Sequence, residues 1–251
     1  MANRRKHSWS PAIGCWVTMP SHWSCEVAAA AGFDAVFLDL EHGTIDVESQ
    51  DRLLAQARAL GLQAYVRVAM AQRAPIQQAL DSGAHAVVLP QVRDLAHAKE
   101  AAAYAKYPPL GLRGMGTPRS LGYGDTPGDF VLRENERTRC YVMVETPGAL
   151  RDARKIAALP TVDGLFMGPY DLSLTRGRGQ FQAGRADDAD ARAIAAAARA
   201  AGKLVGMPAG DERGRRLARE FGAAVITLGE DLGIFAEAMT QTLRRTREAL
   251  G

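Results

Sequence analysis

Five side chains stand where acid–base and metal chemistry could occur, because each lies at or just beyond the end of a short apolar run. They are Asp39, His42, Arg67, Glu145 and Asp171. In barrels of parallel strands, catalytic groups come from the carboxyl ends of the strands and the loops that follow. The pattern therefore predicts that these side chains share one end of such a fold.

Glu145 and Asp171 follow two strands that are consecutive in the predicted order. Two carboxylates that face one another across a barrel mouth repel each other unless a cation or a proton lies between them. A site of carboxylate and water oxygens suits Mg2+ or Mn2+ better than Zn2+. Each acid could instead cap the helix that follows it, but the pair together favours a metal site.

Asp39 and His42 form an Asp-x-x-His unit after the second apolar run. An aspartate that accepts a hydrogen bond from one imidazole nitrogen raises the basicity of the other, which is what a general base needs. A histidine in such a loop can also be purely structural. Glu41, between them, is predicted to point to the opposite side as structural support.

Arg67 ends an apolar strand, where an unpaired guanidinium would be unfavourable. It could form an ion pair with Asp39 or Glu41, or it could stabilise an oxyanion during a reaction. The sequence leaves both roles open.

The elements that must position these residues are strands that alternate with Ala-rich helices. Strands are predicted at Ile13–Thr18, Ala35–Asp39, Ala64–Val68, Ala86–Leu89, Tyr141–Glu145, Gly164–Met167, Leu204–Met207 and Val225–Leu228. Helices are predicted at Glu26–Ala31, Val47–Leu60, Ala74–Ser82, Leu95–Tyr107, Ala149–Ala158, Asp188–Ala201, Arg213–Phe221 and Phe235–Leu250. The segment from Pro108 to Arg139 is predicted to be a long irregular loop.

The strands are almost entirely apolar, as expected for a parallel sheet covered on both faces. Glycines that follow the helices indicate left-handed caps: Gly32, Gly61, Gly83, Gly202 and Gly222. We therefore predict an α/β fold, a (β/α)8 TIM barrel, as one domain over residues 1–251 with a tail at 1–10. An open doubly wound sheet is the alternative, but no G-x-G-x-x-G follows the first strand.

Composition restricts the class of protein. The 251 residues are 47% apolar, carry a formal charge of +3 and include three scattered cysteines. This argues against a disulfide framework, a structural zinc site and a nucleic-acid partner. No apolar run is long enough for a membrane span or a signal peptide, so a cytoplasmic location is expected.

Six segments, in order, resemble the HpcH/HpaI-type class II pyruvate aldolases, the 4-hydroxy-2-oxoheptanedioate aldolase family. They are F-D-A-V-F-L-D-L-E-H-G (Phe33–Gly43), V-R-V (Val66–Val68), L-D-S-G-A (Leu80–Ala84), Y-P-P-L-G-L-R-G-M-G (Tyr107–Gly116), V-E-T-P-G-A-L (Val144–Leu150) and G-L-F-M-G-P-Y-D-L-S (Gly164–Ser173). The resemblance spans roughly Gly14 to Leu228.

The resemblance implies that Glu145 and Asp171 bind Mg2+, Mn2+ or Co2+, which would chelate pyruvate or the 2-keto acid being cleaved. Arg67 would neutralise the enolate oxygen. His42, oriented by Asp39, would remove the proton of the aldol hydroxyl through a water molecule. The partners would be pyruvate, or another 2-keto acid, and an aldehyde.

The resemblance also implies substrate-binding residues. Backbone N–H groups around Tyr170 and Asp171, after Gly168 and Pro169, would bind the carboxylate of pyruvate. Met207-Pro208 stands where related enzymes place an apolar wall beside the aldehyde.

Assembly is implied as well: a homo-oligomer, commonly a hexamer, whose C-terminal helix is exchanged between subunits. Asp81 would reach the active site of the neighbouring subunit, although by sequence alone it is a helix C-terminal acid beside Gly83.

One departure from the family is Met143, which replaces a glutamine two residues before the metal-binding glutamate and puts hydrogen bonding around the metal in doubt. Two alternatives remain: a metal-dependent acyl-CoA lyase like the citrate lyase β-subunit, and a non-catalytic barrel. For the acyl-CoA lyase, only Arg113 and Arg119 could bind the nucleotide part of the substrate. A phosphate-binding isomerase lacks its usual Gly-rich loop. Schiff-base chemistry is disfavoured because no lysine lies at a strand end.

Overall fold

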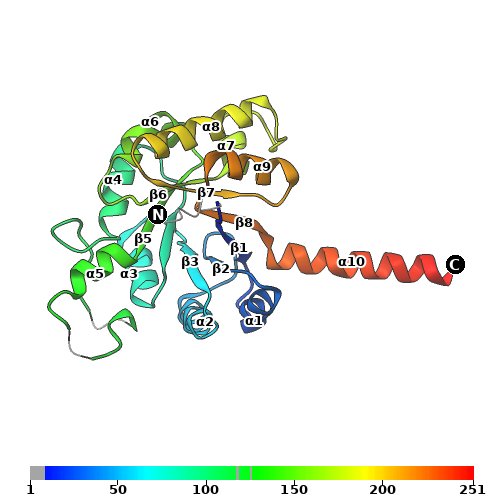
Figure 1. Ribbon diagram of the computed structural model, residues 1–251, viewed down its shortest axis with the longest axis horizontal. Coiled ribbons are helices and arrows are strands. Elements are labelled where there is room, and N and C mark those ends of the chain that lie inside the picture. Colours follow the sequence, from blue (N-terminus) through cyan, green and yellow to red (C-terminus); the bar gives the residue numbers. More distant parts are fainter. Residues whose placement is uncertain (1–8, 117–118, 125) are drawn as a thin grey trace, which may run out of the picture.

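The computed structural model describes residues 9–116, 119–124 and 126–251, and in it eight parallel strands close into a barrel in chain order (Figure 1). The strands are β1 (Ala12–Val17), β2 (Ala35–Asp39), β3 (Gln63–Arg67), β4 (Ala86–Leu89), β5 (Arg139–Val144), β6 (Gly164–Met167), β7 (Leu204–Pro208) and β8 (Val225–Glu230). The predicted (β/α)8 barrel is confirmed. Most of the predicted tail at 1–10 lies outside the described residues, but Trp9 donates its indole N–H to the carbonyl of Ala223 at 2.9 Å.

Helices surround the barrel as an outer layer, apart from the C-terminal helix (Figure 1). They are α1 (His22–Ala31), α2 (Val47–Ala59), α3 (Arg73–Asp81), α4 (Leu95–Ala103), α5 (Phe130–Arg137), α6 (Pro147–Ala157), α7 (Pro169–Thr175), α8 (Arg185–Ala200), α9 (Glu212–Phe221) and α10 (Asp231–Leu250), with a 3-10 turn at Arg119–Leu121. The predicted left-handed caps are confirmed, since Gly32, Gly61, Gly83, Gly202 and Gly222 all have φ between +64° and +102°.

The prediction of an irregular segment from Pro108 to Arg139 is wrong over α5. This helix is amphipathic and buries Phe130 and Glu134. Lys106, placed in a helix by the sequence, instead lies beyond α4 and is almost fully buried. Its ammonium group donates to the carbonyls of Asn135 and Thr138 at 2.8 and 2.6 Å, and so ties the end of α5 to the barrel.

The interior of the barrel is filled by aromatic rings, which form the floor beneath the carboxyl ends of the strands. Phe37 stacks on Tyr65 with 4.4 Å between ring centroids, and Trp16 and Phe166 also contact Phe37. Glycines make room for these rings. A Cβ atom at Gly206 would lie 2.4 Å from the ring of Phe166, so no larger residue fits there. The barrel is therefore a packed core and not a channel.

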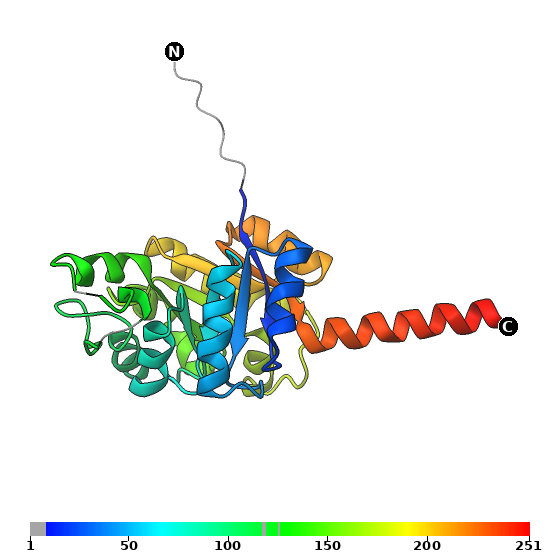
Figure 2. The same cartoon turned by 90° about the horizontal axis from the view of Figure 1, so that it is seen from below.

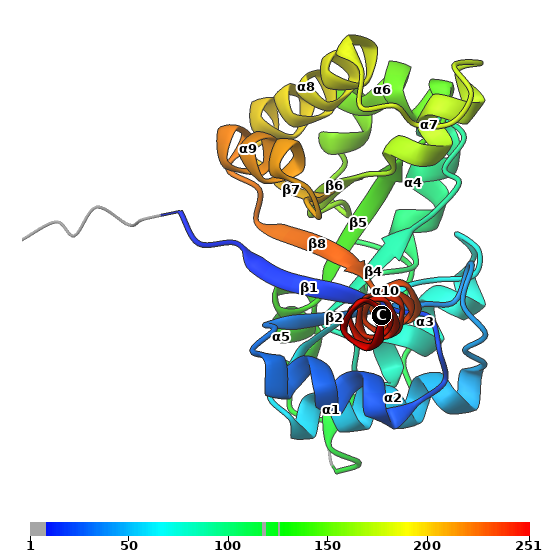
Figure 3. The ribbon, with the colours of Figure 1, turned by 90° about the vertical axis from the view of Figure 1, so that its right-hand side faces the viewer.

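Helix α10 leaves the barrel and projects away from it (Figures 1 and 2). In Figure 3, β8 and β1 are visible between α9 and α1, where an eighth outer helix would otherwise lie. The helix is fixed at its base by Asp231, whose carboxylate accepts from the backbone and hydroxyl of Thr18 and from the hydroxyl of Ser24. No helix in the described part of the chain combines the length and the apolarity that crossing a membrane requires.

Candidate active site

A cavity of about 510 Å³ opens at the carboxyl ends of the strands, and the five side chains singled out in the sequence all line it. Strand alternation explains why they meet. Residues two apart on a strand share a face, and Phe37 and Met143 both lie in the core inside the barrel. Asp39 and Glu145 follow them by two positions and so face the same interior, at its open end.

Asp39 and Arg67 form a rigid ion pair. They are register partners on β2 and β3, and the Nε and Nη2 groups of Arg67 donate to Oδ1 and Oδ2 of Asp39 at 2.8 and 2.5 Å. Oδ1 of Asp39 also accepts from the backbone N–H groups of Glu41 and His42. A bidentate charged pair is among the stronger hydrogen-bonded arrangements. Asp39 therefore holds the backbone of the loop that carries His42. The predicted hydrogen bond between Asp39 and the imidazole is not formed.

Glu41 is turned toward the site, so the prediction that it points to the opposite side is wrong. Its Oε2 atom lies 3.4 Å from Nη1 of Arg67 and 3.8 Å from Nε2 of His42. Burial raises the pKa of Glu41, while Arg67 and His42 oppose that rise. The carboxylate nearest to the imidazole is thus Glu41.

The guanidinium of Arg67 is held between two acids and a ring. Its Cζ atom lies 4.7 Å from the centre of the Trp16 ring. Burial would lower the pKa of Arg67, but hydrogen bonding to Asp39 and the charges of Asp39, Glu41 and Glu145 raise it. The side chain is a fixed positive charge at the cavity wall, suited to stabilising developing negative charge.

Glu145 is fully buried, yet only one of its oxygens has a partner. Oε1 accepts from the backbone N–H of Gln91 at 2.5 Å. Oε2 is buried and has no hydrogen-bond partner among the described residues. It lies over Gly168, where an added Cβ atom would come within 2.6 Å of it. Burial, with a smaller contribution from the charges of Glu41 and Asp171, raises the pKa of Glu145 to about 7, although the hydrogen bond from Gln91 and the charge of Arg67 oppose that rise.

This arrangement fits a divalent cation. A buried carboxylate with an unpaired oxygen needs a proton or a cation, and Asp171, in the first turn of α7, lines the same cavity. No cluster of three or more metal-ligating side chains occurs among the residues that the structure describes. A cation here would have two protein carboxylates and would take its remaining ligands from water or substrate, as Mg2+ often does.

The loop from Gly168 to Asp171 forms one wall of the cavity. Gly168 is the N-cap of α7 and Pro169 its first residue. The N–H groups of Tyr170 and Asp171 lie in the first helical turn, where no earlier carbonyl of the helix can accept from them. Pro208, at the end of β7, lines the cavity from the neighbouring strand.

The structure also locates three other residues that the sequence singled out. Met207 faces the helices and not the cavity. Met143 packs inside the barrel and also lines the floor of the cavity. Asp81, the last residue of α3, is not among the residues lining the cavity and accepts from Nη2 of Arg113 at 2.6 Å. Sequence reasoning missed Trp16 and Gln91, which no motif indicated.

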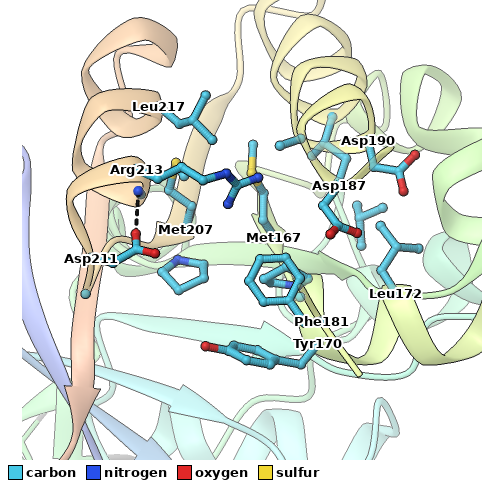
Figure 4. Close-up of a pocket in the computed structure, with 18 of the residues that line it drawn as sticks. Met167, Tyr170, Leu172, Phe181, Asp187, Asp190, Met207, Asp211, Arg213 and Leu217 are labelled. Carbon is cyan, nitrogen blue, oxygen red and sulfur yellow. Dashed lines mark hydrogen bonds between the residues drawn. The ribbon is translucent and has the colours of Figure 1, made fainter. Parts of the chain in front are cut away.

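A smaller cavity of about 260 Å³ lies behind the Gly168–Tyr170 loop, between α8 and α9 (Figure 4). Its charged side chains are already engaged. Asp187 and Asp190 accept from Arg178 at 2.8 Å, and Asp211 caps α9 by accepting from the N–H of Gly214. Since its acids have partners, this cavity lacks the unpaired carboxylate found in the larger one.

Comparison with known proteins places this geometry in a family. Residues 12–238 match the family model described as HpcH/HpaI aldolase/citrate lyase. The chain belongs to that family. Together with the similar aldolases, this makes the chain a carbon–carbon lyase.

Similar proteins cover almost the whole chain. A hydroxypyruvate/pyruvate aldolase of Roseovarius nubinhibens is 33% identical over 94% of this chain and 92% of its own length. A 5-keto-4-deoxy-D-glucarate aldolase of Salmonella arizonae is 33% identical over 93% of this chain and 91% of its own. The crystal structure of an HpcH/HpaI family protein from Burkholderia cenocepacia has a TM-score of 0.87, 29% identity and 96% coverage of both chains.

Proposed function

We propose that the protein is a divalent-metal-dependent aldolase that cleaves or forms 4-hydroxy-2-keto acids through the enolate of pyruvate and an aldehyde. The similar aldolases support this reaction class. The observation that carries the proposal is the unpaired, buried Oε2 of Glu145 in the cavity that Asp171 also lines.

Glu145 and Asp171 would hold Mg2+, Mn2+ or Co2+, which acts as a Lewis acid that polarises the ketone of the substrate. The rest of the chemistry falls to the protein. Arg67 would neutralise the enolate oxygen, because its guanidinium is fixed by Asp39 and lines the cavity. N–H groups of Tyr170 and Asp171 would bind the substrate carboxylate at the start of α7, with Gly168 and Pro169 shaping that turn.

His42 is the proposed general base for the aldol hydroxyl. Its imidazole is exposed at the cavity and lies beside Glu41, while Asp39 holds its backbone. In the synthetic direction it would return the proton. Pro208 would border the aldehyde.

The acyl-CoA alternative loses its two candidate contacts. The side chain of Arg113 is fully buried, bonded to Asp81 and stacked 4.5 Å from the ring of Tyr107. Arg119 pairs with Asp51 at 2.5 Å. Neither arginine is free to bind a nucleotide tail, so the structure favours the aldolase.

We further propose a homo-oligomer, such as a hexamer, in which α10 is exchanged between subunits. Every residue of α10 after Asp231 is exposed, including Leu232, Phe235, Met239 and Leu243 at helical spacing. Apolar side chains in such a stripe favour burial against another surface. Helix α1 carries the exposed apolar side chains of Trp23 and Val27. The reach of Asp81 into a neighbouring site is part of the same proposal.

Exchange of the methyl protons of pyruvate for deuterium, followed by NMR, tests the enolate half-reaction without a known aldehyde. The chelated protein should show no exchange, and Mn2+ should restore it. Enolate formation from pyruvate needs an acceptor for a methyl proton, a role that would also fall to His42, and a charge to neutralise the enolate oxygen, which would be Arg67; His42→Ala and Arg67→Ala should therefore lower the restored rate. Exchange that persists after chelation would contradict the metal mechanism, and no exchange with Mg2+, Mn2+ or Co2+ would refute the proposed function.

A further inference from the structure

Gln91 has an unusual backbone conformation beside the active site. It follows β4 by two residues and has φ of +51°. Outside glycine, only Tyr123 and Ala183 share a positive φ among the described residues. Non-glycine residues rarely adopt this region, and they tend to be retained where the conformation has a use.

The conformation directs one donor at one acceptor. The N–H of Gln91 donates to Oε1 of Glu145 at 2.5 Å, a close hydrogen bond. The bond links the loop after β4 to the end of β5. With Oε1 engaged, the buried Oε2 has no partner among the described residues and is turned over Gly168.

No neighbouring side chain on β5 could replace this donor. Met143, two residues earlier and on the same face, has a thioether that donates no hydrogen bond. Its side chain reaches toward Gly168, since its Cγ would be 3.2 Å from a Cβ atom there. Glu145 is therefore oriented from the main chain of the adjacent loop.

We propose that Gln91 is a positioning residue whose left-handed backbone holds Oε1 of Glu145 by its N–H and so keeps Oε2 free for the cation. This inference rests on the proposed metal-binding role of Glu145. It implies that the backbone conformation at position 91 matters more for metal affinity than the amide side chain, which is directed at Glu41 and not at Glu145. Loss of a partner that orients a metal ligand commonly weakens binding 10- to 100-fold.

The test compares variants that differ in their tolerance of positive φ. Glycine adopts it readily, whereas β-branched valine does not. In the full-length protein, Gln91→Val should weaken the Kd for Mn2+, measured by electron paramagnetic resonance, by about tenfold or more. Gln91→Gly should have a Kd for Mn2+ within about threefold of the wild-type value, and the Kd of Gln91→Ala should lie between those of the glycine and valine variants. Ala183→Val imposes the same strain on another loop, at φ of +56°, and should leave the Kd unchanged.

A second readout needs no metal. In the metal-free protein labelled with 15N-glutamine, the backbone amide proton of Gln91 should resonate far downfield, and this resonance should move upfield in Glu145→Ala. The resonance is assigned to Gln91 by its absence from the spectrum of Gln91→Gly. A folded Gln91→Val protein with wild-type affinity would overturn the inference, as would an ordinary Gln91 resonance. If the downfield resonance is present but Mn2+ does not bind the wild type, the proposed function fails while the hydrogen bond stands.

Discussion

Replacing Glu145 with glutamine should stabilise the metal-free protein at pH 8 while removing metal binding. Glu145 is fully buried and one of its oxygens has no partner in the described structure. Glutamine has the same shape, keeps an oxygen for the N–H of Gln91 and carries no charge. Removing an uncompensated buried charge should therefore stabilise the fold.

The magnitude follows from the raised pKa of Glu145, which is about 7 in the folded protein against an ordinary value of 4.5. A raised carboxyl pKa means that the folded state binds this proton more tightly than the unfolded state. Stability therefore falls as the pH rises from 4.5 to 7, and the whole loss is present above pH 7. At about 1.4 kcal/mol per unit of pKa, the loss is about 3 kcal/mol.

Thermal and urea unfolding of the metal-free proteins at pH 8 and pH 4.5 measure this difference. Glu145→Gln should gain up to about 3 kcal/mol at pH 8, or roughly 6–12 °C in Tm for a domain of this size, and almost nothing at pH 4.5. Added Mn2+ should stabilise the wild type only. Glu230 is an exposed acid at the rim of the same cavity, and Glu230→Gln should change neither value. Equal or lower stability of Glu145→Gln at pH 8 would refute the reasoning.

Three further predictions concern pH, the guanidinium and assembly. Because Glu145 must lose its proton to bind a cation, the affinity for Mn2+ should fall about tenfold per pH unit below about pH 7. Titration calorimetry of Mn2+ binding at pH 6 in two buffers of different ionisation enthalpy should detect release of this proton. Absence of proton release would contradict the raised pKa of Glu145. Arg67→Lys keeps the positive charge but loses the bidentate hydrogen bonds to Asp39, so metal-dependent proton exchange of pyruvate should slow at least about tenfold. Arg52→Lys, in an exposed ion pair with Glu48, is the matched control. Equal exchange rates in the two variants would refute the role of Arg67 at the enolate oxygen. Phe235→Glu places a charge in the apolar stripe of α10 and should lower the mass of the oligomer measured by light scattering. Gln241→Glu, a polar position on the same helix, should not lower it. An unchanged mass for Phe235→Glu would argue against exchange of this helix between subunits.

The sequence by itself determined the barrel. Apolar runs of strand length that alternate with amphipathic helices have few other ways to bury both faces of a sheet. Glycine after a helix reports a backbone angle directly, so its caps were also predictable. Strand ends are local features as well, and this explains why Asp39, Arg67 and Glu145 could be assigned to one rim without coordinates. The helix α5 was missed because its apolar face is short and follows a segment rich in Pro and Gly.

Only the tertiary structure decided which groups pair within that rim. The sequence assigned Asp39 to His42, but the register of β2 and β3 places Asp39 directly beside Arg67, and the charged pair forms instead. Glu41 turns inward for the same reason, since Arg67 offers its remaining donor there. Gln91 lies 54 residues before Glu145 in the chain and acts through its backbone. Partner choice depends on register, burial and distance between distant segments, and a pattern of residue types along one strand contains none of these.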